Sequence, residues 1–375
     1  MPTRYERIKA WLWKRERHIS SLALLGGFIF DIFTLTRVDL PLENFWILVH
    51  LFFAGLGIVL LDVFEDGNGD DESLGSHAGV RFWLIIMMQF GFGGLFSTFL
   101  VFYFRSATLG ESWPFLLVLA VALVCNEAFK KHYSRLTFRI NLLFLAIFSF
   151  AIYALPVMAH RMDSNVFVAS GLFSLLAIFL FLLCLARFAR ESFRRSRWSV
   201  VITIGVIYVG INFLYYANLI PPIPLSLKQA GIYHLVIKND DGTYSGEYEH
   251  HGWSDYLTLY PAYHAAPDDT AYAYTAVFSP ANLNIDIVHE WQHYDEQTEM
   301  WDTAAQIPLS IYGGRDGGYR TYSEKSGLAP GLWRVNVETT SGQLIGRIKF
   351  EVQAVSTSTD TTMPETAPLQ TAILE

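Results

Sequence analysis

One stretch of the chain matches the sequence pattern of a hydrolase zinc site. His289, Glu290 and His293 form the pattern H-E-x-x-H. On a helix, this spacing puts two imidazoles on one face, where they bind zinc while the glutamate acts as a general base. In a β-strand, side chains four residues apart also point the same way, but they lie about 13 Å apart and are too distant to share one metal ion.

The residues around this pattern favour the strand. Apolar or aromatic side chains recur at every second position from 285 to 291, several of them β-branched. No G-x-x-H continuation follows the second histidine. We therefore expect no metal and no other cofactor. Zinc hydrolysis through His289 and His293, with Glu290 as base, stays the alternative.

Two further groups of residues have the chemistry of a binding site. The stretch from Trp253 to His264 is rich in aromatic rings, which can stack on sugars. Four of the eight basic residues after position 220 lie between 315 and 334, where they can hold an anionic group or pair with nearby carboxylates. The predicted ligand-binding residues are Trp253, Tyr260, Tyr263, Trp291, Arg315, Arg320, Lys325 and Arg334. The alternative is that these residues only pack in the core or pair on the surface.

Ionisable and polar residues also interrupt the apolar segments. Burial in lipid is expensive for Asp31, His50, Gln89 and Glu127. Asp31 and His50 flank one turn at similar depth, so they can form a pair that relays protons or binds a substrate. The alternative is a hydrogen-bonded contact that locks two helices, and we favour it. Gln89 and Glu127 are expected to be helix-end or interhelical contacts.

The composition divides the chain in two. Residues 1–220 hold 19 Lys/Arg and 15 Asp/Glu, whereas residues 221–375 hold 8 and 20. The first part contains seven apolar runs of about the ~20 residues that cross a bilayer, at 19–36, 45–64, 82–104, 113–129, 140–158, 166–186 and 199–220. The second part is acidic, which argues against a nucleic-acid partner. Both cysteines, Cys125 and Cys184, lie in apolar runs.

The distribution of basic residues predicts the orientation of these spans. With the N-terminus inside, the cytoplasmic segments hold six, one, four and five Lys/Arg, sixteen in all. The opposite loops hold three. This difference is a strong positive-inside signal, and seven crossings then place the C-terminus outside.

The part after the proline-rich stretch at 221–224 reads as β-structure. Strands are predicted at 232–238, 243–249, 271–278, 285–291, 305–312, 331–339 and 346–352. Ser341-Gly342 is a hairpin turn between the last two, and Pro308 indicates an edge strand. About seven strands in this length indicate an antiparallel, Ig-like β-sandwich, so the expected fold class is α+β multidomain, with a seven-helix transmembrane bundle before the sandwich.

The predicted domain boundaries follow from these patterns. They are a basic amphipathic segment at 1–18, a seven-span region at 19–220, a proline-rich connector at 221–230, a β-sandwich at 231–353 and a disordered tail at 354–375.

The runs PPIPLSLKQAGIYH, TAVFSPANL, HEWQHYD, GGRDGGYRTYSEK and PGLWRVNVETTSGQLIGRIKFEV add a family resemblance. Over residues 221–352 the chain resembles a bacterial domain of unknown function, number twenty-nine fourteen in that series. The domain often follows a multi-span membrane region. The resemblance implies a β-rich extracytoplasmic module and supplies no catalytic residues. Its match centres on His289 and Trp291, which also favours the strand.

These observations lead to one functional expectation and two alternatives. The chain is expected to be an integral protein of the bacterial inner membrane, with its N-terminus cytoplasmic, that displays a periplasmic β-sandwich. Its expected partners are the lipid bilayer and a periplasmic protein or glycan, that is, an envelope component. The alternatives are a membrane-embedded transporter or enzyme that uses Asp31 and His50, and the zinc hydrolase. The residues assign no enzymatic activity.

Overall fold

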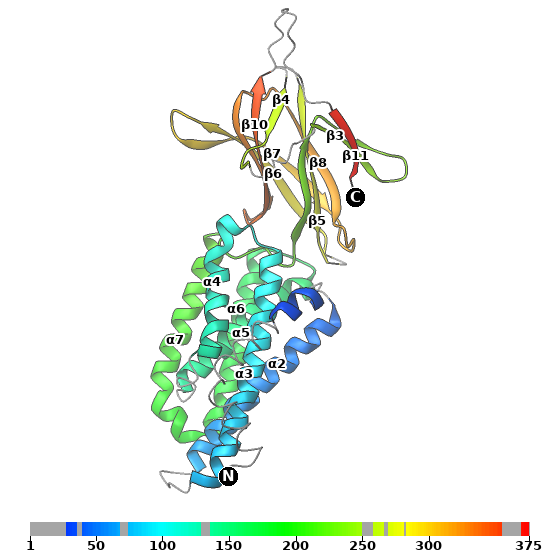
Figure 1. Cartoon of the computed structure of the whole chain (residues 1–375). Coiled ribbons are helices and arrows are strands. Elements are labelled where there is room, and N and C mark those ends of the chain that lie inside the picture. Colours follow the sequence, from blue (N-terminus) through cyan, green and yellow to red (C-terminus); the bar gives the residue numbers. More distant parts are fainter. Residues whose placement is uncertain are drawn as a thin grey trace, which may run out of the picture. The chain divides into compact units, whose positions relative to one another are not determined.

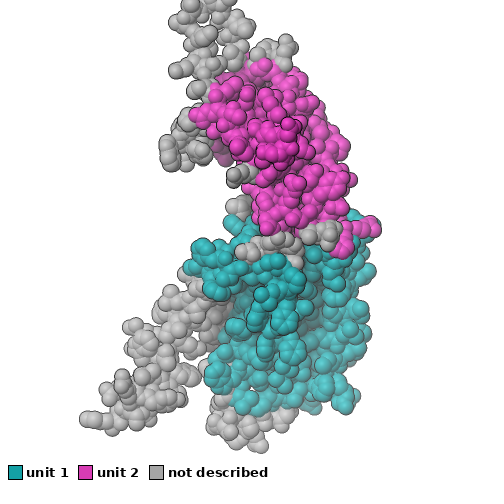
Figure 2. Space-filling view, turned by 90° about the vertical axis from the view of Figure 1, so that its right-hand side faces the viewer, with its two compact units in different colours: residues 1–105, 113–159, 163–219 teal, residues 106–112, 160–162, 220–375 magenta. Residues whose placement is uncertain are grey.

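The computed structural model describes residues 28–35, 40–67, 74–128, 136–249, 258–265, 269–280, 283–354 and 369–374, without the side chains of some residues at helix ends. The chain divides into two compact units. Unit 1 contains residues 1–105, 113–159 and 163–219, and unit 2 contains residues 106–112, 160–162 and 220–375 (Figure 2).

Unit 1 is helical (Figure 1). Its helices are α2 (Pro41–Gly67), α3 (Leu74–Arg105), α4 (Leu109–Ala128), α5 (Leu136–Ala159), α6 (Ser164–Phe188) and α7 (Arg190–Tyr216), and residues 28–34 are helical as well. Five stretches of the described residues are long and apolar enough to cross a membrane: Pro41–Phe64, Trp83–Arg105, Leu136–Ala159, Ser164–Phe188 and Phe193–Tyr216. Ser112–Asn126 is a shorter apolar helix. The expectation of a region of apolar helices is confirmed, and the count of seven spans stays a prediction.

Helix α5 lies at the centre of unit 1, in contact with α2, α3, α6 and α7. Polar contacts connect it to its neighbours within an otherwise apolar interior. The Tyr103 hydroxyl donates to the Ser149 carbonyl at 2.8 Å, and Arg139 Nη2 lies 3.0 Å from Asp62 Oδ1 with both side chains 1% exposed. Arg139, one of the sixteen basic residues counted in the predicted cytoplasmic segments, is therefore a buried partner of Asp62 on α2.

Unit 2 is built of strands in three sheets. The strands are β1 (Ser226–Tyr233), β2 (Leu235–Lys238), β3 (Tyr244–Glu249), β4 (Ala262–Ala265), β5 (Thr270–Phe278), β6 (Ile285–Asp295), β7 (Met300–Ile311), β8 (Tyr319–Ser326), β9 (Gly331–Thr339), β10 (Leu344–Ala354) and β11 (Leu369–Leu374). Their orders are β1-β5-β8, β4-β10-β9-β6-β7 and β11-β3-β2. All pairs among the described strands are antiparallel except β4 with β10.

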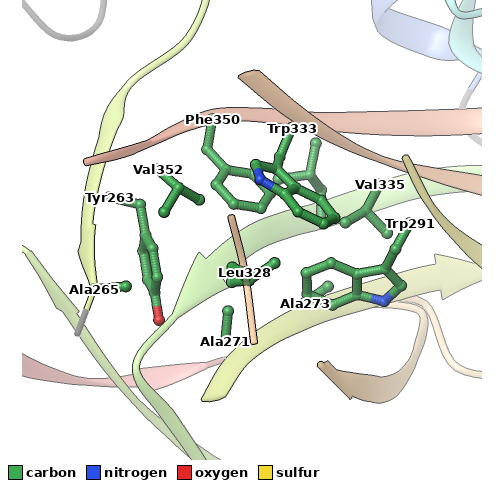
Figure 3. Packing of buried hydrophobic residues seen from close by; sticks show 11 residues of the cluster. Tyr263, Ala265, Ala271, Ala273, Trp291, Leu328, Trp333, Val335, Phe350 and Val352 are labelled. Atoms are coloured by element: carbon green, nitrogen blue, oxygen red, sulfur yellow. The ribbon is translucent and has the colours of Figure 1, made fainter. Parts of the chain in front are cut away.

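The five-stranded sheet packs face to face on β1-β5-β8. Trp291, Trp333 and Phe350 of the five-stranded sheet share one buried cluster with Ala271 and Ala273 of β5. Figure 3 shows Tyr263 and Trp291 on either side of Leu328, with the rings of Trp333 and Phe350 beside them. Small alanines on β5 leave room for these large rings. Such complementary sizes let two sheets interdigitate.

The third sheet covers the opposite face of β1-β5-β8. Tyr233, Tyr244 and Tyr274 form a second cluster with Val236 and Leu374, which belong to β2 and β11. Strand β5 is consequently buried on both faces: Ala273 packs on the five-stranded sheet and Tyr274 on the third sheet. This explains why β5 contains apolar residues and tyrosines with hardly any charge, rather than one wet face.

The structure corrects several boundaries of the predicted sandwich. Residues 369–374, expected in a disordered tail, form β11 because Leu374 buries against the tyrosine cluster. Strand β1 begins at Ser226, inside the expected connector. The architecture has a third sheet and one parallel pair, which strand periodicity does not encode. A β-rich region with antiparallel sheets is confirmed, whereas its assignment to the Ig-like class stays a prediction.

Candidate binding surface

The H-E-x-x-H residues lie on β6 and not on a helix. His289 points into the core, where its Nε2 and Nδ1 lie 3.0 Å and 2.9 Å from the hydroxyls of Thr275 and Ser323. His293 Nε2 lies 3.2 Å from the Pro330 carbonyl. The two imidazoles therefore have separate partners along an extended strand, and the zinc-hydrolase alternative is wrong. No group of three metal-binding side chains occurs among the described residues.

His289 is a structural histidine. Burial lowers its pKa to about 4, so the neutral imidazole is the stable form in the folded domain. Together with Trp291 Nε1, which donates to Ser323 Oγ at 3.0 Å, it ties β6 to the opposite sheet. A fully buried polar contact of this kind keeps its hydrogen-bonding groups satisfied.

The predicted ligand-binding residues separate in space. Tyr263 and Trp291 lie in the core, 3% and 0% exposed, so they are corrected from ligand-binding to packing residues. Both were predicted as binding residues because they are aromatic, although large rings are also the usual content of a sandwich core. Trp253 lies outside the described residues.

The basic residues separate too. Arg320 and Lys325 lie on β8, and Arg315 lies in the turn before it. Arg315 Cζ is 5.7 Å from the ring centroid of Tyr319, and Lys325 Nζ is 5.8 Å from that of Trp333. A single anion site made of all four predicted cations is therefore not formed, because Arg334 is on β9 in the other sheet.

Tyr260 and Arg334, two of the predicted binding residues, both contact the ring of Trp301. They meet on the outer face of the five-stranded sheet, which is the face opposite to Trp291, Trp333 and Phe350. Tyr260 precedes edge strand β4, and Trp301 lies on the other edge strand, β7. Their rings nevertheless lie nearly parallel, at 14°, with centroids 6.4 Å apart. Tyr294 adds a third ring, 5.2 Å from Trp301. We call these three residues the aromatic shelf.

Basic side chains lie against the shelf. Arg334 Cζ is 4.3 Å from the Trp301 ring centroid, and Lys349 Nζ is 5.5 Å from that of Tyr260. Arg334 and Lys349 are directly opposite each other on β9 and β10. Cations over aromatic faces are held by the ring quadrupole, so the positions of these positive charges are restricted.

An ordered polar group continues from the shelf along the same face. Arg334 Nε donates to Gln292 Oε1 at 2.6 Å, and Arg347 Nε donates to Asn336 Oδ1 at 2.6 Å. Glu290 completes the group: it accepts hydrogen bonds from Thr303 at 2.8 Å, Gln306 at 3.1 Å and Asn336 at 3.3 Å. We call Glu290, Gln292, Arg334, Asn336 and Arg347 the outer-face network. Glu290, Gln292 and Asn336 are almost fully buried.

Two carboxylates of this face differ in their electrostatics. Burial raises the pKa of Glu290, but hydrogen bonds from Thr303, Gln306, Asn336 and Gln292 outweigh it and hold the pKa below its usual value. Burial raises the pKa of Glu338, and the charge of Glu290 raises it further. Arg347 and Arg334 act in the opposite sense on Glu338 without reversing the shift. Glu290 therefore keeps its negative charge to lower pH than an ordinary glutamate, because the hydrogen bonds that it accepts stabilise the ionised form.

Sequence reasoning missed most of this surface. Trp301, Gln292, Arg347 and Lys349 were not among the predicted binding residues. The available signal was the content of the outward-facing positions of β9 and β10, where charged residues of both signs and amides recur at every second residue. Trp301 gave no such signal because its neighbours do not alternate.

In the helical unit, Asp31 and His50 have different hydrogen-bond partners among the described residues. Ser97 Oγ donates to Asp31 Oδ2, and His50 Nδ1 lies 2.7 Å from the Trp46 carbonyl. His50 also stacks on Phe90 with centroids 5.2 Å apart. These contacts support the helix-packing role over a proton relay.

The main-chain carbonyl of Gln89 accepts from Asn126 Nδ2 at 3.0 Å, which connects α3 to α4. The side-chain Nε2 of Gln89 is buried and has no hydrogen-bond partner among the described residues, so the expected interhelical role of this side chain stays a prediction. The side chain of Glu127 lies outside the described residues.

Residues 284–352 match DUF2914, a family of proteins of unknown function. The resemblance inferred from the sequence is thus confirmed for this part of the chain. The DUF2914 region contains β6 to β9 and most of β10, so the whole outer-face network lies inside it. A search of curated proteins finds no match to this chain.

Similarity to solved structures is weak. A β-glucosidase from Listeria innocua in complex with gluconolactone is 12% identical over 29% of this chain and 16% of its own, with a TM-score of 0.20. The alkylpurine DNA glycosylase AlkC of Pseudomonas fluorescens, bound to DNA containing an abasic site analog, is 8% identical over 84% and 99%, with a TM-score of 0.21. This chain therefore spans a small part of the glucosidase, and neither likeness carries an argument about the DUF2914 region.

Proposed function

We propose that this chain is a membrane-anchored binding protein. In this proposal the apolar helices cross the bacterial inner membrane seven times with the N-terminus in the cytoplasm. The acidic, strand-rich unit 2, which we call the β-unit, lies in the periplasm. The asymmetry of sixteen Lys/Arg in the predicted cytoplasmic segments against three in the opposite segments supports this orientation. The β-unit then meets envelope components and not cytoplasmic ones.

The observation that carries the binding role is the outer-face network with its aromatic shelf. Gln292 and Asn336 are almost fully buried and therefore need hydrogen-bond partners. Their side-chain oxygens hold Arg334 and Arg347 at 2.6 Å through the arginine Nε atoms, so the two guanidinium groups are fixed in place. Groups that are held in place before binding lose less entropy when a ligand arrives.

A pair of reporters tests the orientation. Alkaline phosphatase fused after Glu375 should be active in cells, whereas green fluorescent protein at the same position should be dark. A fluorescent fusion would place the β-unit in the cytoplasm and refute the periplasmic assignment.

Site-specific cross-linking in living cells tests the binding surface. Pro308 is exposed on β7, on the same outer face, and donates no backbone hydrogen bond. A photo-cross-linking amino acid in place of Pro308 should give adducts with an envelope component. The matched control is the same amino acid in place of Lys238, exposed on β2 in a different sheet. The binding role is refuted if position 308 gives no more adduct than position 238, or if Trp301→Ala leaves the adduct unchanged.

A further inference from the structure

We propose that three side chains, Glu249, His234 and His264, form a pH-sensitive clamp on edge strand β4. This histidine clamp holds β4 firmly when its imidazoles are protonated and less firmly when they are neutral. Glu249 belongs to the third sheet and His264 to the five-stranded sheet, so the clamp joins two sheets of the β-unit. The inference goes beyond the proposed binding function and does not depend on it.

Strand β4 is weakly supported by its own sheet. It has four residues and pairs with β10 alone, in a parallel arrangement. Parallel pairing is slightly less stable per residue than antiparallel pairing. Beyond this pairing, the backbone N–H of His264 donates to Glu249 Oε1 at 2.7 Å. Glu249 therefore adds a hydrogen bond to β4 that the sheet itself does not provide.

Two imidazoles hold the same carboxylate. His264 Nδ1 lies 2.7 Å from Glu249 Oε2, and His234 Nε2 lies 2.9 Å from Glu249 Oε1. An ionised carboxylate only accepts hydrogen bonds, so each ring donates an N–H to it. The ring of His234 also stacks on Tyr263 of β4, with centroids 4.4 Å apart and an angle of 15°. Strand β4 is thus held both through Glu249 and through Tyr263.

The carboxylate at the centre of the clamp is buried and ionised. The side chain of Glu249 is 7% exposed, whereas those of His234 and His264 are 17% and 38% exposed. Burial raises the pKa of Glu249, but the hydrogen bonds from His234, from His264 and from the backbone N–H of His264 outweigh it and hold the pKa below its usual value. Protons from solvent can reach both rings, and a buried negative charge favours their positive form.

Other charged groups near the clamp are acidic as well. Burial, and then the charges of Asp269 and Glu249, raise the pKa of Tyr263. Glu247 lies two residues before Glu249 on β3, and Glu351 lies on β10 where that strand pairs with β4. The basic residue Lys349 of β10 lies against the Tyr260 ring instead. Protonated imidazoles are therefore the groups that balance the negative charge here.

Protonation strengthens the clamp. A histidine ordinarily gains its charge as the pH falls from about 8 to about 5. Each contact with Glu249 then becomes charge-assisted, and such bonds are roughly twice as strong as neutral ones. The contribution of the clamp is therefore fully present in acid, and it is lost as the pH rises and both rings lose their protons. His289 behaves in the opposite way, because its partners are neutral hydroxyls.

The clamp also affects the edge of the outer face. Tyr260 lies two residues before β4, and the carbonyl between them, that of Pro261, accepts from the backbone N–H of Glu351 at 2.9 Å. The clamp therefore sets how firmly one ring of the aromatic shelf is held.

Hydrogen-exchange mass spectrometry of the full chain in detergent at pH 5.5 and pH 7.5 tests the clamp. The quantity compared is the protection factor, the ratio of intrinsic to observed exchange rate, of peptides that cover residues 258–265. We expect β4 protection to be about tenfold higher at pH 5.5, because two neutral hydrogen bonds become charge-assisted. Peptides of β6 should lose protection at pH 5.5 because of His289. Equal β4 protection at the two pH values, or higher protection at pH 7.5, overturns the proposal.

Variants assign the pH dependence to the named residues. The double variant His234→Gln, His264→Gln keeps amide donors for Glu249 but gains no charge, so its β4 protection should be about equal at the two pH values. Glu249→Gln keeps an acceptor for the His264 backbone and removes the negative charge, so protonation of the imidazoles should no longer raise β4 protection.

His293→Gln is the matched control. His293 is a partly exposed histidine of β6 that lies 3.2 Å from the Pro330 carbonyl, outside the clamp, and its variant should keep the wild-type ratio. Unchanged β6 protection at pH 7.5 shows that each variant is folded. A tenfold ratio that persists in the double variant, or that disappears in His293→Gln, refutes the clamp.

Discussion

His289 makes the stability of the β-unit depend on pH. Its imidazole has a pKa of about 4 in the fold, against 6.5 for an ordinary histidine, because burial disfavours the charged form. Between these two values the unfolded chain binds a proton that the folded chain does not. The contribution of His289 to the free energy of unfolding is therefore fully present above pH 6.5, and it is lost as the pH drops toward 4.

The size of this effect follows from the two pKa values. From pH 7 to pH 5 the difference in proton binding lowers the free energy of unfolding by about 2 kcal/mol, since one pKa unit corresponds to about 1.4 kcal/mol. Several carboxylates also titrate in acid, so wild type alone does not isolate His289. The informative variant is His289→Gln, which retains a donor and an acceptor for Thr275 and Ser323 but has no proton to gain.

Hydrogen-exchange mass spectrometry of β6 peptides in the full chain measures the effect. The ratio of observed to intrinsic exchange rate gives the opening free energy at each pH. Wild type should lose about 2 kcal/mol more than His289→Gln between pH 7 and pH 5. Equal losses in the two proteins would show that His289 is not buried in the neutral form, and the assignment of β6 to the core would fail with it.

Two more predictions concern the helical unit. A Cβ at Gly94 would clash with the His50 ring, so Gly94→Ala should lower thermal stability in detergent by about 1–3 kcal/mol, whereas Gly210→Ala, with open space around it, should not. Asp62→Asn should cost about 3–5 kcal/mol because it leaves the Arg139 guanidinium buried beside a neutral group. Adding Arg139→Gln should recover part of that loss. Strictly additive losses would contradict the pairing.

Periodicity alone determined much of the fold. Long apolar runs predicted the helices. Alternation predicted β9 and β10 with a turn at Ser341-Gly342 between them, where Gly342 adopts φ +83°. Pro308 correctly indicated an edge strand, because β7 ends the five-stranded sheet. These are local signals: they depend on residues a few positions apart, which share one helix face or one side of a strand.

Only the tertiary structure decided which side chains meet. An aromatic residue looks the same in sequence whether it packs inward like Trp291 or lies on the outer face like Trp301. Tyr260 and Trp301 are 41 positions apart in the chain. Their rings meet because both lie on the outer face of the five-stranded sheet. Residues 369–374 likewise form a strand, in which Leu374 is buried against the tyrosine cluster. Long-range pairing and burial set these contacts, and no local repeat encodes them.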